Sequence, residues 1–141
     1  MAHEISFESI KRAVAAVAGM RLSDLEGPRR WKAYAQPRQT TCLLARRIRP
    51  DLSLPNLGRR LGGRDHTSIL HAARRAEARL EAGDEGEVLR VYAALNRLGL
   101  EELPGASPTR RPIYLIRHEL DLARTRVAQL EAELARSRSE H

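Results

Sequence analysis

"GGRDHTSILHA", residues 62–72, leads from two glycines through five polar residues into an amphipathic run. Capping the first turn of a helix uses one or two such side chains. A helix that reads DNA uses nearly all of them, because its N-terminal residues face base edges in the major groove. The crowding of polar residues therefore favours a DNA-reading helix. These residues are Arg64, Asp65, His66, Thr67 and Ser68.

The residues before this stretch predict a partner helix in "SLPNLGRRLGG". Ser53 can cap that helix, and Gly62 can adopt the left-handed conformation that ends it. The next helix should begin at Asp65 or His66 and run to about residue 82. Two short helices joined by a glycine turn have the layout of a helix-turn-helix. Their buried faces would be Leu54, Leu57 and Leu61 in the first, and Ile69, Leu70, Ala73, Ala76 and Leu80 in the second.

Helical patterns also cover the rest of the chain, and no β-branched alternating run indicates a strand. We expect helices over residues 6–18, 85–99 and about 112–136, and a helical turn near residue 25. "GPRRWKAYAQP", residues 27–37, is a basic connection, with Pro37 in the first turn of the helix that follows. Trp31 and Tyr34 in this connection are expected to pack on the edge of the core, and the alternative is that they lean on the DNA backbone. The fold class is all-α, with a DNA-binding domain in residues 1–99, a linker in 100–111 and a C-terminal helix in 112–141.

The positive charge is concentrated around the same motif. Residues 28–80 hold 13 basic and 3 acidic residues, a net of +10, in a chain whose total is +7. A local basic block is typical of a protein that binds a polyanion, although arginine-rich composition alone would also give a basic surface. No apolar run is long enough to span a membrane, and no secretory signal opens the chain. The single cysteine, Cys42, fits a reducing cytoplasm.

An enzyme or a metal site would need a different arrangement of residues. Asp65 and His66 are adjacent, so on a helix they point about 100° apart, and no Ser or Cys nucleophile is placed with them. His66 and His71 are five residues apart, a poor spacing for one metal ion. We therefore expect a protein that is not an enzyme and uses no cofactor and no metal.

"PRQ", "SLPNLG" and "GGRDHTSILHA", in this order and spacing, resemble the C-terminal DNA-binding domain of the bacterial replication initiator DnaA, over about residues 5–98. The resemblance implies a DnaA domain IV-like helix-turn-helix that binds double-stranded DNA. Asp65, His66 and Thr67 would read bases in the major groove, and Arg30 would enter the adjacent minor groove. Other residues would hold phosphates or shape that contact, namely Arg29, Lys32, Arg38, Arg46, Pro55, Arg64 and Ser68. The Walker motif "GxxxxGK[ST]" of the DnaA ATPase domain does not occur in this sequence.

The C-terminal helix carries apolar residues at alternating spacings of three and four, the pattern of a coiled-coil seam. With Ile113 as an a position, the g–e pairs Glu119–Arg124, Arg126–Glu131 and Glu133–Arg138 all join opposite charges, as a parallel pair of helices requires. The alternatives are a helix folded back on a stripe of Val88, Val91, Leu95 and Leu98, or one that docks on another protein. The seam comprises Ile113, Ile116, Leu120, Ala123, Val127, Leu130 and Leu134.

Together these features predict a sequence-specific transcriptional regulator in the bacterial nucleoid, and by resemblance an activator. Stand-alone domains of this type occur among activators of phage-like and gene-transfer-agent clusters, and the layout of this chain is similar. One alternative is a replication modulator that competes with DnaA for its boxes. Another is a DNA-bound adaptor whose last helix recruits the transcription machinery or another regulator. The expected partners are double-stranded DNA and a second copy of the chain, with no membrane.

Overall fold

The computed structural model describes residues 5–105 and 113–139, and the side chains of the last helix from His118 onward. These residues form seven helices and no strand, which confirms the all-α prediction. No helix among them is both long and apolar enough to cross a bilayer. The helices are α1 (Phe7–Ala18), α2 (Leu22–Glu26), α3 (Lys32–Ile48), α4 (Leu54–Arg60), α5 (His66–Glu81), α6 (Glu85–Arg97) and α7 (Ile113–Ser139).

Short polar side chains cap α4 and α5 at the positions that the sequence predicts. Ser53 accepts a hydrogen bond from the Asn56 N–H at the start of α4, and Asp65 accepts one from the Thr67 N–H at the start of α5. Each bond satisfies a backbone donor that the first turn leaves without an intrahelical partner. Gly62 follows α4 with φ of +75°, the left-handed conformation expected of it. The predicted helix-turn-helix is therefore confirmed at its caps and at its turn.

Helix α3 begins earlier than the sequence predicts. We expected Pro37 in the first turn, but the helix starts at Lys32 and Pro37 lies inside it. The carbonyl of Trp31 accepts hydrogen bonds from the N–H groups of Tyr34 and Ala35, so a complete turn forms ahead of the proline. Pro37 removes one later bond of the ladder without ending the helix. As a result, the basic connection is only residues 27–31.

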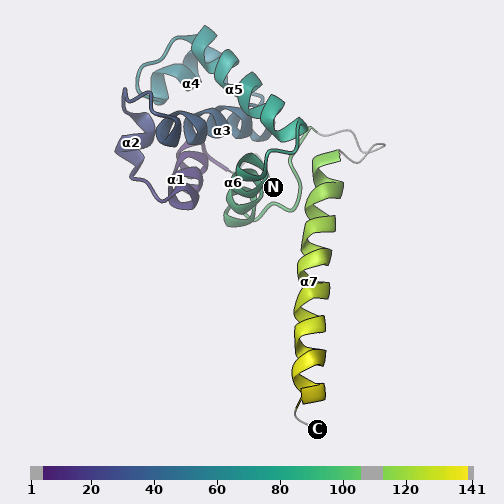
Figure 1. The fold of residues 1–141 in the computed structure, drawn as a ribbon. Coiled ribbons are helices and arrows are strands. Elements are labelled where there is room, and N and C mark those ends of the chain that lie inside the picture. Colours follow the sequence, from purple (N-terminus) through teal and green to yellow (C-terminus); the bar gives the residue numbers. More distant parts are fainter. Residues whose placement is uncertain (1–4, 106–112, 140–141) are drawn as a thin grey trace.

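Helix α3 lies at the centre of the domain, with α1 and α5 packed against it (Figure 1). Helix α4 packs on α5, and α6 closes the core against α1. The stripe of Val88, Val91 and Leu95 on α6 is buried in this core. Val91 and Leu95 are thus covered by the helical domain itself, whereas Val88 also lines a pocket together with Leu122 of α7. Folding back of α7 on the domain stays an alternative to self-association.

A buried carboxylate links α5 to α3 and α6. Glu87 of α6 is fully buried and accepts hydrogen bonds from Thr40 Oγ1 of α3, at 2.6 Å, and from Arg79 Nε of α5, at 2.9 Å. Arg90 also pairs with Glu87 at 3.4 Å and donates to Thr40 at 2.9 Å. A buried charge is tolerated only when it is paired and hydrogen-bonded, and this one has both kinds of partner. The network fixes the C-terminal half of α5 against α3 and α6.

A buried lysine holds the other end of the helix-turn-helix. Lys11 of α1 is only 2% exposed and donates a 2.7 Å hydrogen bond to the carbonyl of Arg60 at the end of α4. Its ammonium group also pairs with Glu8 at 2.8 Å and with Glu26 at 3.2 Å. A cation at a helix C-terminus stabilises the carbonyls that the last turn leaves unpaired. Lys11 thus ties α4 to α1 and α2.

The chain stays on the domain beyond α6, and α7 then projects away from it. Leu103 is buried, and Arg47 donates a hydrogen bond to the carbonyl of Pro104. Half of the predicted linker, residues 106–111, and the side chains of Ile113 and Ile116 lie outside the described residues. Figure 1 shows α7 extending from the side of the domain opposite the start of α5. Near its beginning, the ring of His118 stacks on Tyr92 of α6 with 5.2 Å between centroids.

Candidate nucleic-acid interface

The first turn of α5 presents its polar side chains to solvent. Asp65, His66, Thr67 and Ser68 are all exposed, whereas the next residue, Ile69, is buried against the core. The backbone N–H of Thr67 holds the pKa of Asp65 below its usual range, so the capping carboxylate is ionised at neutral pH. Its other oxygen lies 3.2 Å from His66 Nδ1. The four residues form an exposed row of donors and acceptors, groups of the kind that can hydrogen-bond to base edges.

The turn between α4 and α5 is too tight to admit a side chain at two glycines. The Arg64 N–H donates a 2.7 Å hydrogen bond to the Gly58 carbonyl, and a Cβ added at Gly58 would lie 2.0 Å from the Arg64 carbonyl oxygen. A Cβ at Gly62 would lie 2.1 Å from the carbonyl oxygen of Glu26 in α2. Both glycines let the turn approach backbone closely. The start of α5 is therefore fixed relative to α4 and to the end of α2.

Two predicted site residues, Arg38 and Arg64, are turned inward onto the segment that follows α2. Arg38 is buried and donates to the carbonyls of Leu25, Gly27 and Arg29, at 2.8, 2.9 and 3.0 Å. Arg64 donates to the carbonyls of Glu26, Gly27 and Leu61. Burial lowers the pKa of both arginines, but an arginine stays charged at neutral pH. With their donors used in this way, both residues are placed to shape an interface rather than to reach a phosphate.

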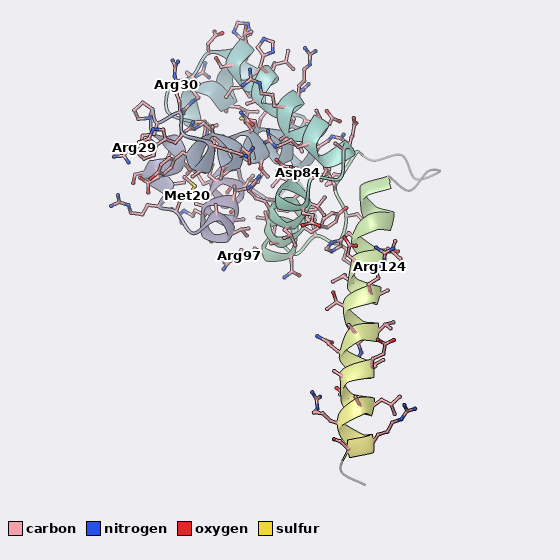
Figure 2. The ribbon with its side chains drawn as sticks, in the orientation of Figure 1. Met20, Arg29, Arg30, Asp84, Arg97 and Arg124 are labelled. Atoms are coloured by element: carbon pink, nitrogen blue, oxygen red, sulfur yellow. The ribbon has the colours of Figure 1, made fainter. Side chains whose placement is uncertain are left out.

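The segment that these arginines hold carries the other predicted cations. Arg29, Arg30 and Lys32 are exposed at the end of the connection and the start of α3. In Figure 2 the Arg30 side chain extends toward the same side of the domain as the start of α5, while Arg29 points outward beside α2. The structure therefore brings Arg30 and the polar turn of α5 to one face, although 34 residues separate Arg30 from Arg64 in the sequence.

A hollow of about 650 Å³ lies between Arg30 and the exposed face of α5. Its wall from α5 includes Ser68, His71 and Arg75, and its wall from α3 includes Gln39. Cys42 also reaches it, but burial raises the pKa of this thiol to about 12, so it stays neutral. Cationic and polar side chains thus line the space that separates the two groups predicted to enter adjacent DNA grooves.

The remaining predicted residues lie at the surface of the domain. Pro55 is exposed in the first turn of α4, and Arg46 is exposed near the end of α3. Sequence reasoning missed Gln39 and Arg75. A signal for Arg75 was available, because it lies seven residues after Ser68 and shares its helix face.

One expectation for this region is wrong. We expected Trp31 to pack on the edge of the core, but its surface is 69% exposed. Tyr34, the other aromatic residue of the connection, is half-buried. The early start of α3 explains the difference, because Trp31 is the residue that precedes the helix and its side chain points to solvent instead of the core.

Comparison with known proteins shows the family of the helix-turn-helix. Residues 7–76 match the family described as the bacterial DnaA protein helix-turn-helix. The chain is similar to the chromosomal replication initiator protein DnaA of Cereibacter sphaeroides, with 47% identity over 74 residues, or 52% of this chain and 16% of the relative. The corresponding protein of Caulobacter vibrioides is 49% identical over 74 residues, or 52% of this chain and 15% of the relative. That of Roseobacter denitrificans is 41% identical over 100 residues, or 70% of this chain and 21% of the relative.

The chain thus spans between 15% and 21% of the length of these relatives. The matched region covers α1 to the middle of α5, and it includes both the glycine turn and the basic connection. Through this region, the chain belongs to the bacterial DnaA helix-turn-helix family.

Proposed function

We propose that this protein is a sequence-specific regulator of transcription that binds double-stranded DNA. The single observation that carries the proposal is the exposed first turn of α5, with Asp65, His66 and Thr67 on a rigid glycine turn and Arg30 on the same face. In this proposal the turn of α5 reads the major groove, and Arg30 enters the adjacent minor groove. Arg29, Lys32, Arg46, Pro55 and Ser68 contact the backbone, while Arg38 and Arg64 position the basic connection.

The charge of the exposed residues supports this partner. Exposed cations occur in the basic connection and on α3, α4 and α5. A duplex carries one negative charge for about every 1.7 Å of its axis, so each arginine that reaches a phosphate releases counterions and adds affinity for any sequence. These cations are Arg29, Arg30, Lys32, Arg46, Arg59, Arg74 and Arg75.

The first test separates base reading from general affinity. Changing His66 or Thr67 to alanine should remove about 1–3 kcal/mol of discrimination between the preferred site and unrelated DNA, with non-specific binding largely retained. Thr125→Ala is the matched control for Thr67→Ala, since it makes the same substitution at an exposed residue of α7. Competition binding with specific and random duplexes measures the discrimination. Full sequence preference in both variants of the α5 turn would show that this turn does not read bases.

The second test separates the minor groove from the phosphate backbone. Arg30→Ala should weaken binding most on sites with flanking A·T tracts, whose narrow minor groove concentrates negative potential. Arg46→Ala should weaken all sequences about equally and reduce the salt slope by about one. Arg97→Ala removes the same charge from α6, on the side of the domain away from Arg30 (Figure 2). It should change neither the affinity for DNA nor the salt slope. Titrations at several salt concentrations measure these effects. Equal losses from Arg30→Ala and Arg46→Ala on every site would contradict the distinction.

A second candidate function is competition with DnaA for its boxes. The observation that favours it is the identity of 41–49% with replication initiator proteins over the helix-turn-helix. A chain that reads the same bases would occupy the same sites. Genome-wide mapping of bound DNA separates the two functions, because a regulator of transcription occupies promoters and a replication modulator occupies the origin.

We also propose that α7 joins two copies of the chain. The apolar residues of the seam from Leu120 to Leu134 are exposed along the helix, so the domain does not cover them. Opposite charges at the three g–e pairs favour a parallel second copy. The alternative occupant is another protein, such as part of the transcription machinery.

A further inference from the structure

The only tryptophan of the chain stands on the surface within a small cluster. The ring centroids of Trp31 and Tyr34 are 6.1 Å apart, and the Arg29 guanidinium lies 5.7 Å from each of them. We call these three residues the Trp31 cluster. An indole left 69% exposed forgoes the burial that makes tryptophan stabilising in a core. The position is therefore better explained by contact with a partner than by stability of the domain.

The backbone beneath the cluster is held rigidly. The Trp31 carbonyl accepts hydrogen bonds from Tyr34, at 2.9 Å, and from Ala35, at 2.8 Å. The Arg29 carbonyl accepts a 3.0 Å bond from the buried Arg38. Little backbone entropy would be lost when a partner covers the cluster, because the segment is already ordered. The Trp31 cluster has the properties of a preformed contact surface.

The surroundings of the cluster indicate which partner fits. Its neighbours Arg30 and Lys32 are exposed cations, so the covering surface must be negative. Arg30 also lines the hollow shared with Ser68 of α5, which places the cluster at the rim of the candidate nucleic-acid interface. A duplex that contacts both α5 and Arg30 would therefore also lie beside Trp31, at the edge of the contact surface. This continuity favours DNA over an acidic protein.

We propose that the Trp31 cluster is part of the duplex interface and adds the Trp31 indole to the residues assigned above. The indole packs against the deoxyribose wall of the minor groove that Arg30 enters, and Arg29 is presented to the flanking phosphates. This inference rests on the proposed function, since it requires α5 and Arg30 to contact one duplex. Sugars and phosphates are the same in every sequence, so the cluster adds affinity without adding base preference.

The expected result is a loss of affinity that is the same for all sequences. Trp31→Ala should weaken binding to specific and random duplexes about tenfold, the effect of a well-placed aromatic side chain at an interface. Trp31→Phe should recover most of that affinity, because it keeps an apolar ring. Leu89→Ala is the matched control, since it truncates a side chain that is 61% exposed on α6. Circular dichroism verifies that each variant is folded.

Fluorescence of the wild-type chain provides an independent reading, because all its indole emission comes from Trp31. A duplex with one binding site should shift the emission to shorter wavelength and reduce quenching by acrylamide. The inference is overturned if the wild-type chain binds its site with His66-dependent preference while the emission is unchanged and Trp31→Ala binds normally. The cluster would then serve a protein partner. If the wild-type chain binds no duplex, the proposed function itself fails.

Discussion

Replacing Glu87 by alanine is expected to lower the free energy of unfolding of the helical domain by about 3–5 kcal/mol. The carboxylate is fully buried between α3, α5 and α6, and it is the shared partner of Arg79 and Arg90. Without it, two guanidinium groups would lie side by side with no buried counter-charge, and the Thr40 hydroxyl would keep only the Gln36 carbonyl as an acceptor. Small domains have a total stability of only about 5–15 kcal/mol, so the variant should be largely unfolded at moderate temperature.

Chemical denaturation followed by circular dichroism measures this effect. Glu85→Ala is the matched control, because it removes the same side chain from the same first turn of α6 at an exposed position. Glu85→Ala should change the free energy of unfolding by no more than about 0.5 kcal/mol. Glu87→Gln keeps the shape and an acceptor for Thr40 but loses the charge, so its stability should fall between those of the other two variants. Equal stability of Glu87→Ala and Glu85→Ala would mean that the network does not hold the domain together.

The sequence predicted those parts of the fold that depend on local rules. Ser53 and Asp65 cap helices because their side chains reach an N–H two or three residues ahead, and this requires nothing from the rest of the fold. Gly62 needs its left-handed conformation for a similarly local reason. The polar turn of α5 could be recognised because its residues are neighbours in the chain. The helix-turn-helix was therefore predictable before the packing of the domain was known.

The buried charges could not be predicted in this way. Lys11, Arg38 and Glu87 each occur in a helical pattern, where a charged residue normally marks the exposed face. Their burial depends on partners far away in the sequence: Thr40 lies 47 residues from Glu87, and the Arg60 carbonyl lies 49 residues from Lys11. Arg38 was assigned to the interface by resemblance, yet its direct contacts are all with backbone carbonyls of its own chain. Only the folded arrangement shows which charged side chains are buried on backbone carbonyls and which are exposed.

Removal of α7 is expected to have the second large effect, on binding to paired sites. The full chain should bind a duplex with two sites about 10²–10⁴ times more tightly than a chain truncated after residue 108, because the second contact becomes intramolecular. On a duplex with one site the two chains should bind alike, since Figure 1 places α7 away from the start of α5. Sedimentation of both chains at tens of micromolar measures self-association, and titration of one-site and two-site duplexes measures the gain.

A pair of adjacent substitutions decides what covers the seam. Leu130 is a d position of the predicted coil, and Gln129, the residue before it, lies off the seam. Leu130→Glu should place two carboxylates in the apolar interface of a parallel pair and abolish both self-association and the paired-site gain. Gln129→Glu adds the same charge on the solvent side and should leave both intact. If the wild-type chain is a monomer and gains nothing on paired sites, α7 does not join two copies. A seam that is exposed in the monomer would then have to be covered by a different protein, and Leu130→Glu would be the variant that loses that partner.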